Sequence, residues 1–91
     1  MTAVIDIAAR PRLVTKAMLR YDPVRESNLL LLPERVVRLN ESSAAILARC
    51  DGSRTVKELI EALEQEYGTD GLAADVTAFL NAAREHGWVQ A

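Results

Sequence analysis

Two glycine-containing breaks divide the second half of this 91-residue chain into three short segments, and this division constrains the fold more than any other feature. Gly52 follows the segment 41–50, and the run 68–71 (GTDG) separates the segment 55–67 from the segment 72–86. Glycine ends helices readily because it adopts the left-handed backbone conformation without steric cost. Helices this short bury one apolar stripe each and need partners to cover it. The sequence therefore predicts three helices that pack on one another and on a further layer.

Each of the three segments has the start signals and the apolar spacing of a helix. Asn40 is a suitable N-cap for the first helix, and Thr55 with Glu58 has the spacing of a capping box at the start of the second. Apolar residues recur every three or four positions, which predicts one buried face for each helix. These residues are Ala44, Ile46, Leu47 and Cys50 in the first segment, Val56, Leu59, Ile60, Leu63 and Tyr67 in the second, and Leu72, Val76, Phe79, Leu80 and Ala83 in the third.

The first third of the chain has the turn signals and short apolar runs of a small antiparallel sheet. Residues 13–21 (LVTKAMLRY) are compatible with a strand, Asp22-Pro23 marks a turn, and residues 27–34 (SNLLLLPE) form an apolar run that predicts a second strand. Residues 35–39 (RVVRL) follow as a third strand. We therefore expect an α+β fold, a small winged helix-turn-helix in which an N-terminal three-stranded antiparallel meander precedes a three-helix bundle.

The ends of the chain have weaker signals. Residues 1–12 are expected to be a flexible N-terminal tail, because Pro11 disfavours regular structure, and residues 13–91 are expected to form the domain. After Gly87, Trp88-Val89 either folds back onto the core or adds a short strand.

Composition excludes several classes of function. Eleven basic and thirteen acidic residues give a net charge of −2. Proteins that bind nucleic acid need a cationic face, and this composition does not predict one. Apolar runs such as Leu29 to Leu32 are far too short to span a membrane, and the N-terminus lacks the pattern of a secretory signal. The single cysteine cannot form an internal disulfide, which is typical of a reducing compartment. These observations predict a cytoplasmic domain that binds neither nucleic acid nor membrane.

The residues that could carry chemistry do not form a catalytic pattern. Cys50 lies on an apolar stripe, at a helix C-terminus and beside Asp51, where the thiolate is disfavoured, so we expect a buried and unreactive thiol. One cysteine and the single histidine, His86, do not supply a zinc ligand set. We therefore predict no catalytic residue, no cofactor and no metal.

Two binding functions remain open from the residues alone. The helix-turn-helix outline suggests a DNA regulator, but the third helix offers only Asn81, Arg84 and His86 for contacts with DNA. The alternative is the strand RVVRL, which lies at a sheet edge in a three-stranded meander. Arg35 and Arg38 either protect this edge against aggregation, which is the commoner role, or flank a groove where an extended peptide pairs as a further strand.

The order of motifs resembles the PqqD family, the peptide chaperones of pyrroloquinoline quinone biosynthesis. The resemblance covers about residues 10–90. It lies in LLLLPERVVRLNESSAAILARCDGSRTVKELIEALEQEY followed by DVTAFLNAAREHGWV. Its most specific parts are Leu32-Pro33-Glu34, Leu39-Asn40 with Ile46-Leu47, Cys50-Asp51-Gly52 with Thr55-Val56, Asp75-Val76 with Phe79-Leu80, and Gly87-Trp88.

This resemblance implies a recognition element for ribosomally made, modified peptides that holds no cofactor and does no chemistry. Such proteins bind the precursor peptide PqqA as an added strand and present it to the radical-SAM enzyme PqqE, which cross-links a Glu and a Tyr of the peptide. By this resemblance the peptide-binding residues are Arg35, Val36, Val37 and Arg38 on the edge strand, with Asp75, Phe79, Ala82, Ala83 and His86 on the facing helix. The alternatives are a recognition element for a different modified peptide and a winged-helix DNA regulator. The open edge is compatible with a monomer or with a strand-exchanged dimer.

Overall fold

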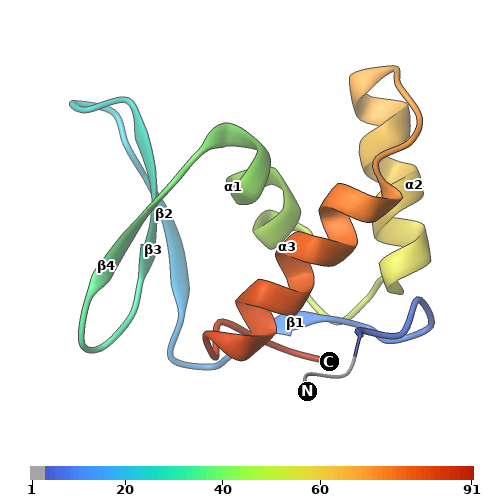
Figure 1. The fold of residues 1–91 in the computed structure, drawn as a ribbon. Helices are drawn as coiled ribbons and strands as arrows, with labels where there is room; N and C mark the ends of the chain where they lie inside the picture. The colour runs from blue at the N-terminus through green and yellow to red at the C-terminus, as the bar shows by residue number, and fades with distance from the viewer. Residues whose placement is uncertain (1–3) are drawn as a thin grey trace.

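The computed structural model describes residues 4–91, and its helices and strands form an α+β domain with a sheet on one side of three helices (Figure 1). In chain order the elements are β1 (Arg12–Leu13), β2 (Met18–Asp22), β3 (Ser27–Leu31), β4 (Val36–Leu39), α1 (Glu41–Ala48), α2 (Val56–Tyr67), α3 (Ala73–Glu85) and β5 (Val89–Gln90). The three helices and the antiparallel meander of β2, β3 and β4 agree with the α+β expectation.

The meander has an inner face toward the helices and an outer face toward solvent. Leu29 lies opposite Arg38, and Leu30 lies opposite Val37, in the antiparallel register of β3 and β4. Because side chains alternate along a strand, Leu30 and Leu39 share the inner face, where they are 0% and 8% exposed. On the outer face Val36 is 60% exposed. One-sided burial of this kind fixes the register of the strands.

The first predicted strand is shorter than expected and is divided between two sheets. A turn, closed by the hydrogen bond from the Ala17 amide to the Val14 carbonyl, interrupts residues 13–21. Residues after this turn form β2, whereas β1 before it pairs with β5 at the C-terminus. The Val14 amide donates to the Trp88 carbonyl, so the return of the chain at Trp88 and Val89 is confirmed as a short strand. β1 pairs with the distant strand β5, so the strand that the sequence predicts over residues 13–21 is divided.

Residues 4–12 differ from the expected flexible tail, because they pack along the helices. Ile5 is 2% exposed, and its amide donates to Oδ1 of Asn81 on α3 at 2.8 Å. The carbonyls of Ile7 and Ala9 accept hydrogen bonds from amides at the start of α2, and Pro11 is fully buried. Thus two buried side chains, Ile5 and Pro11, and several backbone bonds hold the segment 4–12, while residues 1–3 lie outside the described residues.

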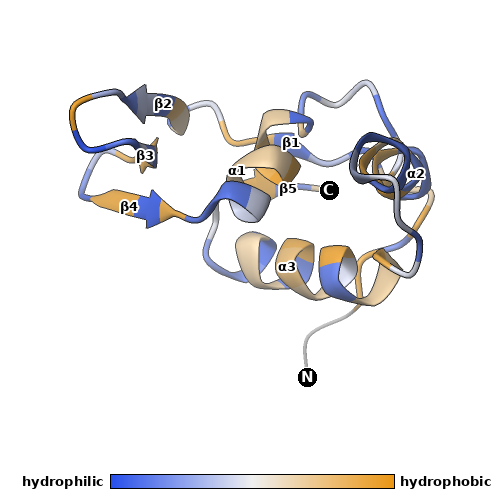
Figure 2. Cartoon of the chain, turned by 90° about the horizontal axis from the view of Figure 1, so that it is seen from above, coloured by the Kyte–Doolittle hydropathy of each residue, from blue (hydrophilic) through white to orange (hydrophobic). Residues whose placement is uncertain are grey.

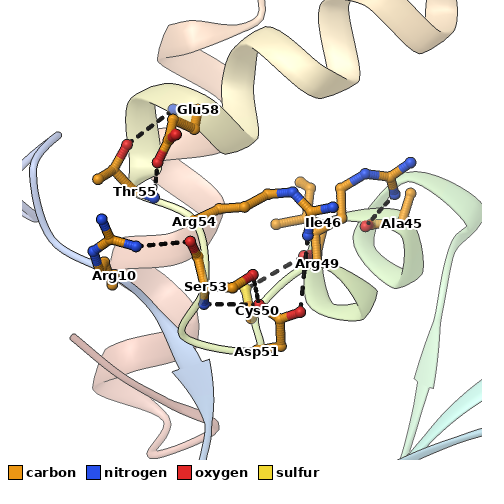
Figure 3. A network of polar contacts seen from close by, with 10 residues as sticks. All are labelled: Arg10, Ala45, Ile46, Arg49, Cys50, Asp51, Ser53, Arg54, Thr55 and Glu58. Atoms are coloured by element: carbon orange, nitrogen blue, oxygen red, sulfur yellow. Dashed lines mark hydrogen bonds and ion pairs between the residues drawn. The ribbon is translucent and has the colours of Figure 1, made fainter.

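The helix starts are confirmed at the side chains that the sequence predicts. Asn40 accepts from the Ser43 amide at the start of α1. At α2 the Thr55 hydroxyl accepts from the Glu58 amide at 3.1 Å, and the Glu58 carboxylate accepts from the Thr55 amide at 2.9 Å (Figure 3). Gly68 ends α2 in the left-handed conformation. These reciprocal bonds satisfy amides that a helix start otherwise leaves without partners.

The core contains most of the predicted apolar stripes. Leu47, Val56, Leu59 and Leu80 are fully buried. Tyr67 is an exception among the residues expected to be buried, because it is 50% exposed at the last turn of α2. This position leaves its ring at the surface between α2 and α3, where a pocket opens.

Candidate functional site

The free edge of β4 is the first part of the candidate site. β4 is an outer strand of the meander, and it forms the edge on the side of the molecule where α3 lies (Figure 2). The Arg35 carbonyl accepts from the Leu32 amide across the turn before β4. Backbone groups of successive residues point to opposite sides of a strand, so Val37 and Leu39 turn their amides and carbonyls toward β3. Val36 and Arg38 turn theirs away from β3, toward the open edge.

The side chains of β4 alternate in the same way. Val37, half-buried, packs on the core beside Leu30, whereas Val36 and Arg38 lie on the outer face. The guanidinium of Arg38 lies back over β3, where Nε and Nη2 donate to Oγ of Ser27 at 3.3 and 3.0 Å. Arg35 is exposed in the turn that precedes β4. The side chains of Arg35 and Arg38 therefore lie beside the open edge and do not cover its backbone groups.

The second part of the site is an apolar pocket of about 380 Å³ where the three helices meet. Its walls come from the first turns of α1, the second half of α2, the segment before α3 and the first half of α3. The residues that line it are Ser42, Ser43, Ile46, Leu63, Tyr67, Thr69, Leu72, Asp75, Val76 and Phe79. Because α1 begins two residues after β4, the pocket wall that Ser42 and Ser43 form lies a few residues beyond the C-terminal end of the free edge.

Helix caps position the walls of this pocket. Asn40, between β4 and α1, fixes the first turn of α1, which carries Ser42 and Ser43. Glu64 on α2 accepts from the amide of Leu72 at 3.0 Å and so holds the start of α3 against α2. This contact supplies a partner for an amide at a helix start that has no side-chain cap of its own. Local capping therefore sets the spacing between the walls.

The residues predicted on α3 lie in different surroundings. Asp75 and Phe79 line the pocket together. Ala82 is exposed on the next turn, but Ala83 is 0% exposed and belongs to the core, so it cannot contact a peptide on the surface. His86 follows the helix and stacks on Trp88 with ring centroids 4.8 Å apart. The structure thus brings Asp75 and Phe79 into one site and places Ala83 and His86 elsewhere.

Sequence reasoning missed the pocket walls on α1 and α2. The sequence places Ile46 and Leu63 only on buried stripes and gives no functional signal for Ser42 and Ser43, yet all four line the pocket. Tyr67, at the end of the apolar stripe of α2, lines the pocket, but the sequence places it only on the buried face. Its neighbours come from α3 and could not be identified without the packing.

The thiol of Cys50 is placed for packing rather than for reaction. Its Sγ donates to the Ile46 carbonyl at 3.3 Å, and the side chain is 3% exposed (Figure 3). Burial, together with the neighbouring carboxylate of Asp51, raises the pKa of Cys50 to about 12. The pKa of Asp51 itself is lowered, chiefly by the hydrogen bond from the Ser53 hydroxyl. The expectation of a buried thiol is confirmed.

Within residues 4–91, no three His, Cys, Asp or Glu side chains come together in a group that could hold a metal ion. In the same part of the chain, no helix has the length and apolar character needed to cross a membrane.

Comparison with known proteins finds relatives that match most of this chain. The family profile described as coenzyme PQQ synthesis protein D (PqqD) matches residues 28–89, a range that includes β4 and all three helices. The PqqA binding protein of Azotobacter vinelandii is 37% identical over 81 residues, which cover 88% of each chain. The PqqA binding protein of Rhodopseudomonas palustris is 36% identical over 93% of this chain and 85% of its own length.

A solved structure shows the same fold. The solution NMR structure of the PqqD truncation of Methylobacterium extorquens PqqCD, described as a functional and stand-alone RiPP recognition element, superposes with a TM-score of 0.76. It is 32% identical, over 89% of this chain and 88% of the other. The profile match spans more than half of the chain, and the relatives cover nearly all of it. The chain therefore belongs to the PqqD family.

Proposed function

We propose that this chain is a peptide chaperone of pyrroloquinoline quinone biosynthesis that binds the precursor peptide PqqA by strand addition to β4. The observation that carries the proposal is the open edge of β4 beside an apolar pocket lined from three helices. The proposal is supported by relatives named PqqA binding proteins, which resemble this chain over nearly its whole length. In this view β2 to β4 form the wing of a winged helix-turn-helix.

Strand addition uses the backbone groups of Val36 and Arg38. An extended peptide that pairs with these two residues completes hydrogen bonds that the sheet leaves open. Main-chain bonds of this kind tolerate many peptide sequences, because every residue except proline has the same donor and acceptor. Selectivity must then come from side chains on either side of the added strand.

The apolar pocket gives such selectivity. A peptide that continues past the end of β4 reaches the first turn of α1. There Ser43 on α1, together with Phe79 on α3, lines the apolar pocket. A volume of about 380 Å³ accommodates one or two large apolar side chains, and their burial contributes about 1.5–3 kcal/mol each. We assign Asp75, beside Phe79, to the polar rim of this pocket. Ala82 and His86 then lie along the further course of α3.

The role that follows is non-catalytic. The domain binds and orders a flexible precursor, and the partner that acts on the bound peptide is the radical-SAM enzyme PqqE. We place this activity in the cytoplasm, because the chain has one cysteine and it is a free, buried thiol. The open edge is compatible with a monomer or with a strand-exchanged dimer at high concentration.

The direct test is an NMR titration of the ¹⁵N-labelled protein with a synthetic PqqA precursor peptide. Saturable amide shifts are expected in β4 and in the pocket, including Asp75 and Phe79. A peptide that shifts only amides at the distant corner between α1 and α2, around Asp51 and Ser53, would place the site on another face. Absence of saturable shifts would contradict peptide binding altogether.

A pocket-filling variant tests the second contact. Ser43→Leu adds bulk to the pocket wall, and we expect weaker peptide binding with the fold retained. Ala48→Leu is the matched control, because Ala48 is exposed on the same helix and does not line this pocket. Equal affinity of the two variants would show that the pocket takes no part in binding.

A further inference from the structure

The outer face of the meander carries a charge pattern that strand addition extends onto the peptide. The cross-strand row of Arg20, Leu29 and Arg38 ends at the free edge of β4. The neighbouring row on the same face, Met18, Leu31 and Val36, is apolar. A peptide strand added to β4 places one of its own side chains at the end of each row.

The guanidinium of Arg38 is oriented for one more partner. Ser27 accepts from Nε and Nη2, which is the side of the planar group that faces back over β3. Ser27 is itself fixed, because its hydroxyl donates to the Arg25 carbonyl at 3.1 Å and its side chain is 7% exposed. A guanidinium has about five N–H donors, so the Nη1 and Nη2 end remains available. This end has the spacing that binds a carboxylate through two parallel hydrogen bonds.

Carboxylates of the chain itself do not occupy this end. Within the described residues Arg38 forms no ion pair with a carboxylate, whereas Arg49 pairs with Glu66 and Arg54 with Asp51. Glu26 and Glu41 line the same shallow hollow as Arg38 without forming an ion pair with it. An acidic group of another molecule can therefore bind in this hollow to the guanidinium of Arg38, which Ser27 already holds in position.

We infer that Arg38 reads an acidic side chain of the bound peptide, at the position directly opposite it in the added strand. This inference rests on the proposed strand addition. Arg38 is not in a hydrogen-bonded pair with Leu29, so in an antiparallel addition it forms a hydrogen-bonded pair with the peptide residue opposite it. The backbone of that residue is then fixed by two bonds, and its side chain lies on the outer face beside the guanidinium. Its two neighbours point to the inner face.

The chemistry of the recognised segment follows from this register. The neighbours of the acidic residue lie beside Val37 and Leu39, on the face that packs toward the helices, so apolar side chains suit these two peptide positions. The preferred segment is therefore an acidic residue between two apolar ones, in an extended conformation. Arg38 fixes which acidic residue of a precursor takes this position, so it is a specificity-determining residue for the register.

The experiment is a double-mutant cycle measured by isothermal titration calorimetry. Each Asp or Glu of a synthetic PqqA precursor peptide is changed in turn to its amide and titrated into the wild-type protein and into Arg38→Gln. At one peptide position the change to the amide is expected to weaken binding to the wild type by about 3- to 10-fold. The same change is expected to have no further effect on binding to Arg38→Gln. Arg20→Gln is the matched control, since Arg20 lies in the same row on the opposite edge of the sheet. It is expected to bind every peptide as the wild type does.

Ser27→Ala tests the orientation of the guanidinium. It keeps the charge of Arg38 but removes the acceptor of its Nε and Nη2, so the coupling to the acidic residue should fall without being abolished. If no acidic position is coupled to Arg38 while NMR shifts still map to β4, the inference is wrong and strand addition stands. Equal losses in Arg20→Gln and Arg38→Gln would also overturn it, because they would indicate a diffuse charge effect. If the wild-type protein binds no peptide, the proposed function fails and this inference with it.

Discussion

Substitution of Val36 by proline tests the free edge of β4 most directly, because it removes one backbone donor and little else. The Val36 amide points away from β3, so proline there removes no bond of the ladder between β3 and β4. Its side chain is 60% exposed, so the core loses little apolar contact. Proline is tolerated on edge strands when its nitrogen faces solvent. We therefore expect the free domain to keep its fold.

The effect on peptide binding follows from one lost hydrogen bond. The net contribution of a backbone hydrogen bond is about 0.5–1.5 kcal/mol, which corresponds to an increase of about 2- to 12-fold in the Kd for the precursor peptide. The peptide carbonyl that faced the Val36 amide is left with no partner in the complex, which favours the upper part of this range. Isothermal titration calorimetry with the PqqA precursor peptide measures the change.

Two further variants separate the amide from other effects. Val36→Ala shortens the same side chain but keeps the amide, so it should bind the peptide nearly as the wild type does. Val37→Pro removes an amide that points toward β3, so it should lower the melting temperature of the free domain rather than act on the peptide alone. If Val36→Pro and Val36→Ala bind with equal affinity while both remain folded, the open edge of β4 is not the peptide site.

Three other predictions concern the scaffold. Ile5→Ala should reduce the free energy of unfolding by about 2–4 kcal/mol in urea denaturation, whereas the control Ile7→Ala, at a position 57% exposed, should change it by less than about 0.5 kcal/mol. Thr55→Ala removes the hydroxyl that accepts from the Glu58 amide, and calorimetry should show the melting temperature falling by about 4–8 °C for a loss of about 1 kcal/mol. Burial raises the pKa of Cys50 from 9.0 to about 12, so the folded state holds its proton more tightly than the unfolded state does. This contribution to stability is present below about pH 9 and is lost as the pH rises toward about 12, and Cys50→Ala should remove that part of the alkaline slope. An identical alkaline slope in the wild type and in Cys50→Ala would contradict the pKa prediction for Cys50. Equal effects of Ile5→Ala and Ile7→Ala would contradict the role of Ile5, and an unchanged melting temperature in Thr55→Ala would contradict the role of the cap.

Part of the candidate site could be predicted from the sequence. The strand 35–39 was identified by its β-branched residues and its position after a proline turn, and the resemblance to PqqD placed the peptide there. The residues alone left Arg35 and Arg38 as either edge protection or recognition groups. The hydrogen bonds from Arg38 to Ser27 show where its guanidinium lies, and no feature of the sequence indicates that diagonal contact.

On α3, too, the sequence predicts some features and only the packing shows the others. The spacing of Val76, Leu80 and Ala83 places all three on one face of the helix, and Ala83 is buried in the core as that spacing indicates. A peptide-binding role for Ala83 conflicts with this periodicity. Asp75 and Phe79 lie near each other on the helix, but the pocket that they share with α1 and α2 depends on how the three helices cross.

The sequence by itself determined the features that depend on neighbours within a few residues. The capping box of Thr55 and Glu58, the left-handed glycine at position 68 and the apolar stripes of the helices act within one or two turns, so they could be located by spacing alone. The burial of Cys50 followed from the same local pattern.

Tertiary structure alone decided the features that join distant parts of the chain. The segment 4–12 is held by α2 and α3, β1 pairs with β5, and the pocket forms where three helices meet. Which amides of β4 remain free also depends on its register with β3. Each of these features requires partners brought together by burial of a common core, and local propensity does not specify which distant segment fills a given place.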